Sequence, residues 1–291
     1  MNRFRKILPP LFVLALPSLC AAGFTLLQAG LDARGAAMGF TGAASSTGAS
    51  AMYWNPALLA VSPSPEAALT VNRWIQEVQA GAFAFSRSGF GLSLHYSHVG
   101  GIEHRIVPSE QPVGTFSAND AVFGIAYARR VSPAFSFGVR LNGYYEKIYI
   151  DEATGIGGDL GMVWSPGLSG LRIGAAVQHI GKTGKLRQDA VQLPLTIRVG
   201  AGYRTAGPGG RWEAAVECVR IRGGDPGVHT GLEWVGFGRI ALRAGYQSGH
   251  ETRGLTAGIG FDLEKIRISY GFIPFRSGLG DAHSLTAVFS L

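Results

Sequence analysis

Apolar and polar side chains alternate one by one along most of this chain from Glu66 onward. In residues 89–99, for example, Phe90, Leu92 and Leu94 fall on one face, while serine, histidine and glycine fall on the other. Successive side chains of a β-strand point to opposite faces, so this period of two predicts strands rather than helices. The fold class is therefore predicted to be all-β, with one wholly apolar face on each strand.

Such strands could form a soluble sandwich or a barrel in a membrane, and two features favour the membrane. The apolar faces are long and often end in an aromatic residue, as the girdles at bilayer interfaces require. The opposite faces carry arginine, serine, threonine and glycine, which suits a crowded interior. Charged residues make up only 15% of the chain. No apolar run of about 18 residues follows the N-terminus, so we expect no spanning helix.

The alternating segments predict a transmembrane up-and-down antiparallel β-barrel of about 14 strands over residues 64–291. Tight turns such as Arg87-Ser88-Gly89 alternate with mostly longer loops, among them residues 100–119 and 151–154. Short connections on one side and long ones on the other are typical of such barrels, and an even number of strands places both ends on the periplasmic side. The predicted strands are centred near Thr70, Phe83, Leu94, Ile125, Val139, Gly158, Ala175, Val199, Val216, Leu232, Leu242, Gly258, Ile268 and Ala287.

Residues 1–22 are predicted to be a cleaved signal peptide. Three basic residues precede an apolar core over residues 8–19, and small residues follow at 20–23. The core is too short to span a bilayer, so we expect cleavage rather than anchoring. Cys20 would suit lipoprotein processing, but Leu19 stands where a small residue is expected. Export combined with a barrel predicts location in the cell outer membrane, with outer-membrane lipid around the wall.

Residues 23–63 fit neither a strand nor a packed helix, because they are rich in glycine and alanine without a regular period. The lumen of a barrel of this size stays open unless something fills it. Small residues let an irregular segment lie close to the wall, and asparagine before proline favours a turn. We therefore expect this segment to plug the lumen, with a hatch motif formed by Tyr53, Trp54, Asn55, Pro56 and Ala57.

If the apolar faces contact lipid, charged residues on the opposite faces point into the lumen. Charges inside a membrane barrel must be paired, hydrogen-bonded or hydrated. They could form ion pairs that tie the plug to the wall, or they could line a selective polar conduit. The predicted lumen-facing charges are Arg140, Arg198, Arg204, Glu213, Glu217, Arg239, Arg243 and Arg267.

We predict no catalytic residue, no metal site and no cofactor, and hence a protein that is not an enzyme. Ser93 and His95 share a strand face, but no carboxylate can be named to orient the histidine. Gly181-Lys182-Thr183 matches the end of a phosphate-binding loop, yet the earlier glycine is missing and no helix follows. The seven histidines lack helical pair spacing and accompanying cysteines.

Nucleic acid is not an expected partner. The formal net charge is +7, and three of the positive charges lie in the predicted signal peptide. The remaining basic residues are scattered through the strands, whereas a nucleic-acid surface requires a basic patch.

Two stretches resemble the N-terminal signature of the PorV/PorQ-like outer-membrane proteins, which are relatives of the FadL long-chain fatty acid transporters. The first is Asp32-Ala33-Arg34-Gly35-Ala36-Ala37-Met38-Gly39, and the second is Tyr53-Trp54-Asn55-Pro56-Ala57. The resemblance implies a plugged barrel of this size. Through PorV, a shuttle in type IX secretion, it implies a role in protein secretion and surface attachment, with exported proteins or secretion-machinery components as partners. Through FadL it implies the alternative, passage of small hydrophobic ligands across the outer membrane.

Overall fold

A computed structural model describes residue 27 and residues 31–62, 64–105, 111–186 and 189–291. The predicted signal peptide over residues 1–22 lies outside the described residues. Fourteen antiparallel strands close into a barrel, in which each strand pairs with its neighbours in the chain and β1 closes the ring against β16. The predicted fold class is confirmed. The barrel strands are β1 (Glu66–Arg73), β2 (Gln79–Arg87), β3 (Phe90–His104), β4 (Gly114–Arg130), β5 (Phe135–Ile148), β6 (Asp151–Trp164), β7 (Leu171–Thr183), β10 (Thr196–Gly207), β11 (Gly210–Ile221), β12 (Gly227–Gly236), β13 (Ile240–Gln247), β14 (Leu255–Leu263), β15 (Ile266–Pro274) and β16 (Asp281–Ser290).

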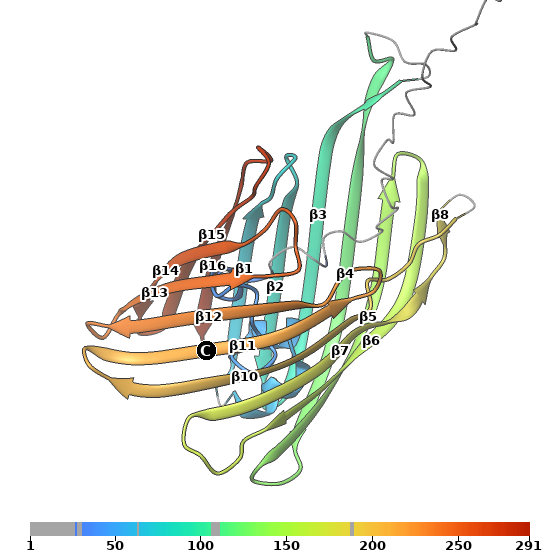
Figure 1. Ribbon diagram of the computed structural model, residues 1–291. Coiled ribbons are helices and arrows are strands. Elements are labelled where there is room, and N and C mark those ends of the chain that lie inside the picture. Colours follow the sequence, from blue (N-terminus) through green and yellow to red (C-terminus); the bar gives the residue numbers. More distant parts are fainter. Residues whose placement is uncertain (1–26, 28–30, 63, 106–110, 187–188) are drawn as a thin grey trace, which may run out of the picture.

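Every predicted strand centre falls in a separate barrel strand, because the period-two pattern is strong in the middle of each strand. The short strands β8 (Lys185–Leu186) and β9 (Asp189–Ala190) pair with each other in the connection between β7 and β10. In Figure 1 the strands run steeply tilted around a common lumen.

Because of the alternation, the outer face of the barrel carries apolar side chains and the inner face carries polar or small ones. Along β5, Phe137, Val139 and Leu141 are 47%, 48% and 67% exposed, whereas Arg140 and Asn142 are 4% and 1% exposed. Apolar side chains on the outer face suit a hydrocarbon environment, since lipid cannot hydrogen-bond to polar groups. The part of the chain that the structure describes contains no helix long and apolar enough to cross a membrane.

The connections differ between the two ends of the barrel. Short turns follow β2, β4, β12 and β14 on the end that also holds both barrel termini, where the Leu291 backbone N–H donates to the Pro65 carbonyl at 3.0 Å. We call this end the turn side and the opposite end the loop side. Figure 1 shows β3 and β4 rising beyond the other strands on the loop side.

Two predicted loops are wrong, because the strands continue through them. β3 reaches His104 and β4 begins at Gly114, past an irregularity in register between Val99 and Ile102. β6 begins at Asp151, which leaves a tight turn after β5. Gly100 and Gly101 interrupt the side-chain alternation, but the backbone ladder resumes after the bulge.

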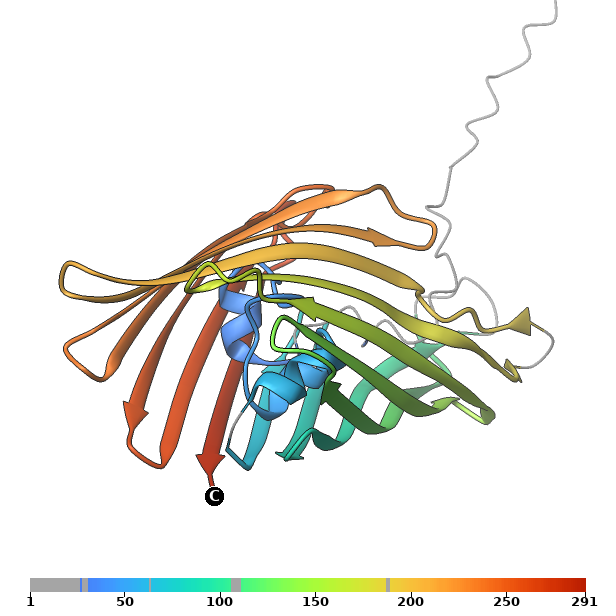
Figure 2. The same cartoon turned by 90° about the horizontal axis from the view of Figure 1, so that it is seen from below.

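Residues 31–62, which we call the luminal segment, lie inside the ring of strands (Figure 2). Three short helical elements form it, α1 (Ala33–Ala37), η2 (Ala49–Tyr53) and η3 (Pro56–Val61). α1 packs against β13 to β16, η2 against β1 and β2, and η3 against β4 to β6. The segment therefore crosses the lumen and contacts opposite parts of the wall.

Candidate functional site in the barrel lumen

Asp32 fixes the start of α1 and joins it to the second half of the luminal segment. Its Oδ1 accepts from the Gly35 backbone N–H at 2.7 Å, which caps the first turn of the helix. Its Oδ2 accepts from Trp54 Nε1 at 2.5 Å. Asp32 and Trp54 are each only 4% exposed, so both ends of this bond are removed from water. A buried indole N–H needs a partner, and the aspartate supplies it.

The hatch motif is buried and is bonded to the wall. Asn55 caps η3 by accepting from the Ala57 backbone N–H at 3.0 Å, and Pro56 occupies the first turn, where its missing N–H costs nothing. The Asn55 amide also donates to the carbonyls of Ala43 at 2.8 Å and of Met162 in β6 at 3.0 Å. One asparagine thus joins two parts of the luminal segment and the barrel.

Tyr53, the first residue of the motif, also links the luminal segment to the barrel wall. Its hydroxyl donates to the Phe83 carbonyl in β2 at 2.8 Å, and its own carbonyl accepts from Gln178 in β7 at 2.6 Å. Asn55 and Ala57 are fully buried, and Tyr53 is 4% exposed. Tyr53 and Asn55 therefore attach the motif to β2, β6 and β7.

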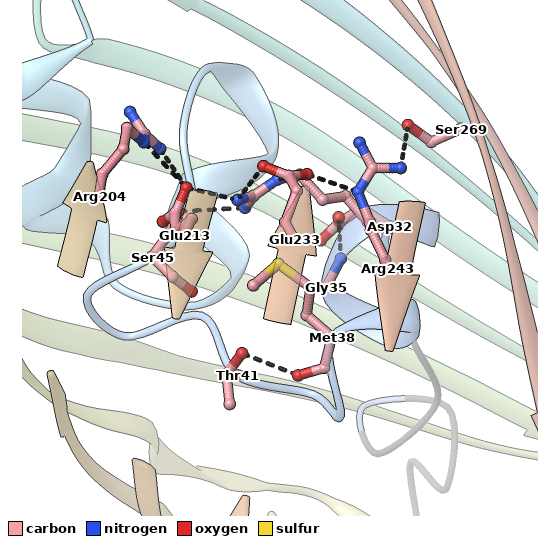
Figure 3. A network of polar contacts seen from close by, with 11 residues as sticks. Asp32, Gly35, Met38, Thr41, Ser45, Arg204, Glu213, Glu233, Arg243 and Ser269 are labelled. Atoms are coloured by element: carbon pink, nitrogen blue, oxygen red, sulfur yellow. Dashed lines mark hydrogen bonds and ion pairs between the residues drawn. The ribbon is translucent and has the colours of Figure 1, made fainter. Parts of the chain in front are cut away.

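A chain of ion pairs holds α1 against the neighbouring strands β11 and β12 (Figure 3). Arg34 contacts Glu213 through Nη2 at 2.9 Å and Glu233 through Nε at 3.0 Å, and its Nη1 donates to the Ser45 carbonyl at 3.0 Å. Arg204 contacts Glu213 at 2.6 Å, and Arg243 contacts Glu233 at 2.5 Å. Two carboxylates thus hold three guanidinium groups, and the central one belongs to the luminal segment. Buried carboxylates need such partners to stay charged.

A third carboxylate, that of Glu217, binds the backbone of the luminal segment. Glu217 Oε2 accepts from the backbone N–H groups of Gly42 and Ala43, each at 2.8 Å, and its Oε1 contacts Arg198 at 2.6 Å. Arg198 donates in turn to the Phe40 carbonyl at 3.2 Å and lies over the Trp54 ring at 5.0 Å. The wall therefore satisfies backbone groups that no strand or helix would otherwise pair.

Glycines in the wall let the luminal backbone approach closely. A Cβ added to Gly174 would overlap the Ala43 carbonyl, and one added to Gly161 would overlap Asn55 Oδ1. Gly245 would collide in the same way with the Gly39 backbone N. The small residues on the inner face of the strands are thus explained by contact with this segment.

The three remaining predicted charges, Arg140, Arg267 and Arg239, have different surroundings. Arg140 is 4% exposed, donates to Ser93 Oγ at 2.7 Å, contacts Asp159 at 3.4 Å and lies over the Tyr53 ring at 5.3 Å. Arg267 pairs with Glu66 near the turn side. Arg239 immediately precedes β13, which begins at Ile240, and lines a cavity at the turn side of the lumen. Its side chain is 63% exposed at the rim and pairs at 3.7 Å with Glu264 of the next turn.

Arg34 and Gln178 were missed by the sequence prediction. Arg34 lies outside the strands, so the period-two rule could not assign it to a face, although it stands alone as a basic residue in a glycine- and alanine-rich stretch. Gln178 and His179 are both buried because an irregularity in the β6–β7 register places His179 at φ 60°, so adjacent side chains turn inward together.

The polar groups near Ser93 form contacts within the wall and with the luminal segment. Ser93 Oγ accepts from Arg140 and lies 3.4 Å from the Gly124 carbonyl, to which it donates. His95 instead lies beside the Tyr53 ring, with the ring centroids 6.4 Å apart. Across the described ranges, no three histidine, cysteine, aspartate or glutamate side chains are grouped so that they could hold a metal ion.

The luminal segment separates two cavities of different size. A cavity of about 660 Å³ opens on the turn side, and Asp32 and Arg34 contribute to its lining. A cavity of about 30 Å³ lies toward the loop side and is lined by Phe40, Tyr53 and Trp54 among others. The hydrogen bond between Asp32 and Trp54 therefore lies where the segment divides them.

Known proteins resemble this chain in sequence over its N-terminal part and in structure over most of its length. A family model described as "Type IX secretion system protein PorV" matches residues 18–161. No curated protein matches.

Three solved barrels show the same fold. A TodX deltaS2S3 mutant, titled a monoaromatic hydrocarbon channel, is 14% identical with a TM-score of 0.66, over 89% of this chain and 97% of that one. CymD, also titled a monoaromatic hydrocarbon channel, is 14% identical with a TM-score of 0.61, over 90% and 98%. A Pseudomonas aeruginosa FadL homologue is 12% identical with a TM-score of 0.56, over 89% and 98%.

These matches confirm the resemblance seen in the two sequence stretches, both of which lie within residues 18–161. At such low identity the solved structures establish the fold alone. The chain thus resembles the PorV family over residues 18–161, and as a whole it is a β-barrel of the outer membrane with the fold of the FadL-type barrels.

Proposed function

We propose that this barrel supports protein secretion and surface attachment in the manner of a type IX secretion component, by binding exported proteins on its loop side. The PorV family match supports this role. The turn side then faces the periplasm, as in outer-membrane barrels generally. The function requires docking surfaces and a sealed wall, and it requires no chemical step.

The filled lumen is the observation that carries this proposal. The luminal segment is bonded to β2, β6, β11 and β12 by Tyr53, Asn55 and Arg34 among others. The cavity beside it on the loop side measures about 30 Å³. On the same measure one water needs about 10–15 Å³, whereas an apolar cavity that takes up benzene measures about 150 Å³. A barrel sealed in this way suits a docking protein better than a channel.

The loop side offers a surface for a protein partner. The β3–β4 hairpin projects beyond the wall (Figure 1), and the rings of His104, Phe116 and Tyr149 pack together on it with centroids 5.6 to 6.4 Å apart. Val113 and Ile150 nearby are 65% and 71% exposed. Exposed apolar and aromatic residues are characteristic of interface centres.

Transport of small hydrophobic molecules is the second candidate. Two of the structural neighbours are titled monoaromatic hydrocarbon channels. The small loop-side cavity is lined by polar side chains and by Phe40, Tyr53 and Trp54, and these three rings would suit an apolar solute if the luminal segment moved.

One comparison separates the two candidates. A deletion strain is examined both for its secreted and surface-attached proteins and for its uptake of labelled hydrophobic compounds. The secretion proposal predicts that surface proteins are lost or released while uptake is unchanged. Normal surface proteins together with lost uptake would contradict it and would support transport. In either case the wild-type chain expressed from a plasmid must restore the missing property.

A further inference from the structure

The turn-side cavity carries an excess of positive charge. It measures about 660 Å³ and is enclosed by the turn-side ends of the strands and by the underside of the luminal segment. Four carboxylates line it, Asp32, Glu66, Glu233 and Asp262. Twice as many arginines do so, namely Arg34, Arg130, Arg172, Arg204, Arg211, Arg239, Arg243 and Arg267.

The wall itself neutralises only some of these arginines. Five of the eight arginines form ion pairs, and their partners are Glu213, Glu233, Glu66 and Glu264. Within the part of the chain that the structure describes, no carboxylate lies within 4.0 Å of the guanidinium groups of Arg130, Arg172 or Arg211. These three come from β4, β7 and β11, so the uncompensated charge is spread around the wall.

Arg172 is the most enclosed of the three. It is only half-buried, yet it lines both the large cavity and an adjoining one of about 380 Å³ beneath the turn between β6 and β7. Ser165 and Arg204 line both cavities as well. A guanidinium that has no carboxylate partner and faces two open spaces is suited to bind an oxyanion from outside the chain.

The luminal segment also contributes hydrogen-bonding groups to the lining. Ser46, Thr47, Ser50 and Ser62 of this segment line the cavity, together with Ser64. Hydroxyl groups both donate and accept, so they can pair with a peptide backbone. The cavity therefore offers arginines for side-chain carboxylates and hydroxyls for a main chain.

The closed wall determines where a ligand can come from. All fourteen barrel strands pair with neighbours, so lipid headgroups outside the barrel have no direct entry to the lumen. The cavity opens among the turns, on the periplasmic side, and its volume lies in the range of pockets that enclose ligands. We propose that the turn-side cavity binds an acidic, extended segment of a periplasmic protein. This inference is independent of whether the barrel serves secretion or transport.

The test uses the purified full-length barrel in detergent micelles and a fluorescein-labelled hexaglutamate peptide. Fluorescence anisotropy should show saturable binding that is lost on raising the salt concentration to about 0.5 M, because the attraction is electrostatic. Labelled hexaglutamine should not bind. Arg172→Gln should weaken hexaglutamate binding about five- to tenfold, and Arg130→Gln should weaken it by a smaller factor.

Arg129→Gln is the matched control. Arg129 precedes Arg130 in β4 and is exposed, but it does not line the cavity. The substitution removes the same charge from the whole protein, so unchanged affinity is expected. Equal weakening by Arg129→Gln and Arg172→Gln, or no saturable binding by the wild type, would overturn the proposal. Binding of inorganic pyrophosphate but not of hexaglutamate would overturn the peptide assignment in favour of a phosphate ligand. Each variant is first checked for the heat-dependent gel migration of a folded barrel, and Arg130→Gln provides the second test if Arg172→Gln does not fold.

Discussion

The two halves of the luminal segment are held in the barrel by different kinds of interaction. α1 is fixed by charge, because Arg34 shares Glu213 and Glu233 with two arginines of the wall. η3 is fixed by neutral hydrogen bonds from Asn55 and by apolar packing that includes Ala57, Leu58 and Val163. The first half should therefore respond strongly to the loss of a charge, and the second half to changes in shape and hydrogen bonding.

The largest effect is expected at Arg34. Arg34→Ala leaves Glu213 and Glu233 with one guanidinium each in a buried setting, which should cost about 3 kcal/mol of unfolding free energy. Urea-induced unfolding in lipid vesicles measures this loss of unfolding free energy. Arg34→Lys keeps the charge but cannot contact both carboxylates with one planar group, so an intermediate loss is expected. A loss below about 0.5 kcal/mol for the alanine variant would show that the ion-pair chain does not hold α1.

The substitution Asn55→Ala tests how the second half of the luminal segment is held. Asn55→Ala removes three hydrogen bonds and leaves the Ala57 N–H and the Ala43 and Met162 carbonyls without this partner, which should cost about 2 kcal/mol. No charge is left unpaired, so the loss should be insensitive to salt and smaller than that of Arg34→Ala. Urea unfolding at low and high salt makes the comparison, and the reverse order of the two losses would break the distinction between the halves.

A change of shape in the wall should act through the luminal backbone. Gly174→Ala places a methyl group against the Ala43 carbonyl, so the segment or strand β7 must shift, at a cost of about 1–2 kcal/mol. Gly143→Ala in β5 is the control, because no described atom lies within 4 Å of a Cβ built there. Thermal unfolding of the two variants should separate them, and equal midpoints would contradict the close contact.

The smallest effect is expected at the rim. Arg239 and Glu264 are 63% and 84% exposed, so their pair is screened by water. Arg239→Gln should change the unfolding free energy by less than about 0.5 kcal/mol. Arg243→Gln, which removes the 2.5 Å contact with Glu233, should cost several times more. Similar losses at both positions would mean that burial does not set the strength of these pairs.

The sequence alone was sufficient to predict the barrel, but it predicted only part of the arrangement of side chains in the lumen. Period-two alternation located all fourteen barrel strands, because the bilayer demands an apolar outer face along each of them. The same rule also placed Arg198, Arg204, Glu213 and Glu217 among the inward charges that contact one another. It failed at the β3–β4 hairpin, where the ladder continues although the side-chain pattern does not.

The contacts of the luminal segment could not be derived from periodicity. Arg34 pairs with residues 179 and 199 positions away, and no local pattern specifies such partners. The inward orientation of His179 depends on a register irregularity and a positive φ. Neither can be predicted from the residue types. Asn55 and Pro56 did carry a local signal, since asparagine before proline favours a capped turn, and they form such a cap on η3.

The central claim is that the luminal segment seals the barrel, and planar-bilayer conductance tests it most directly. The full chain should insert with almost no conductance, because the segment occupies the lumen. A chain that lacks residues 24–61 and still migrates as a folded barrel should give large, stable conductance steps. Equal conductance in the two proteins would contradict the seal and, with it, the argument that favours docking over passage.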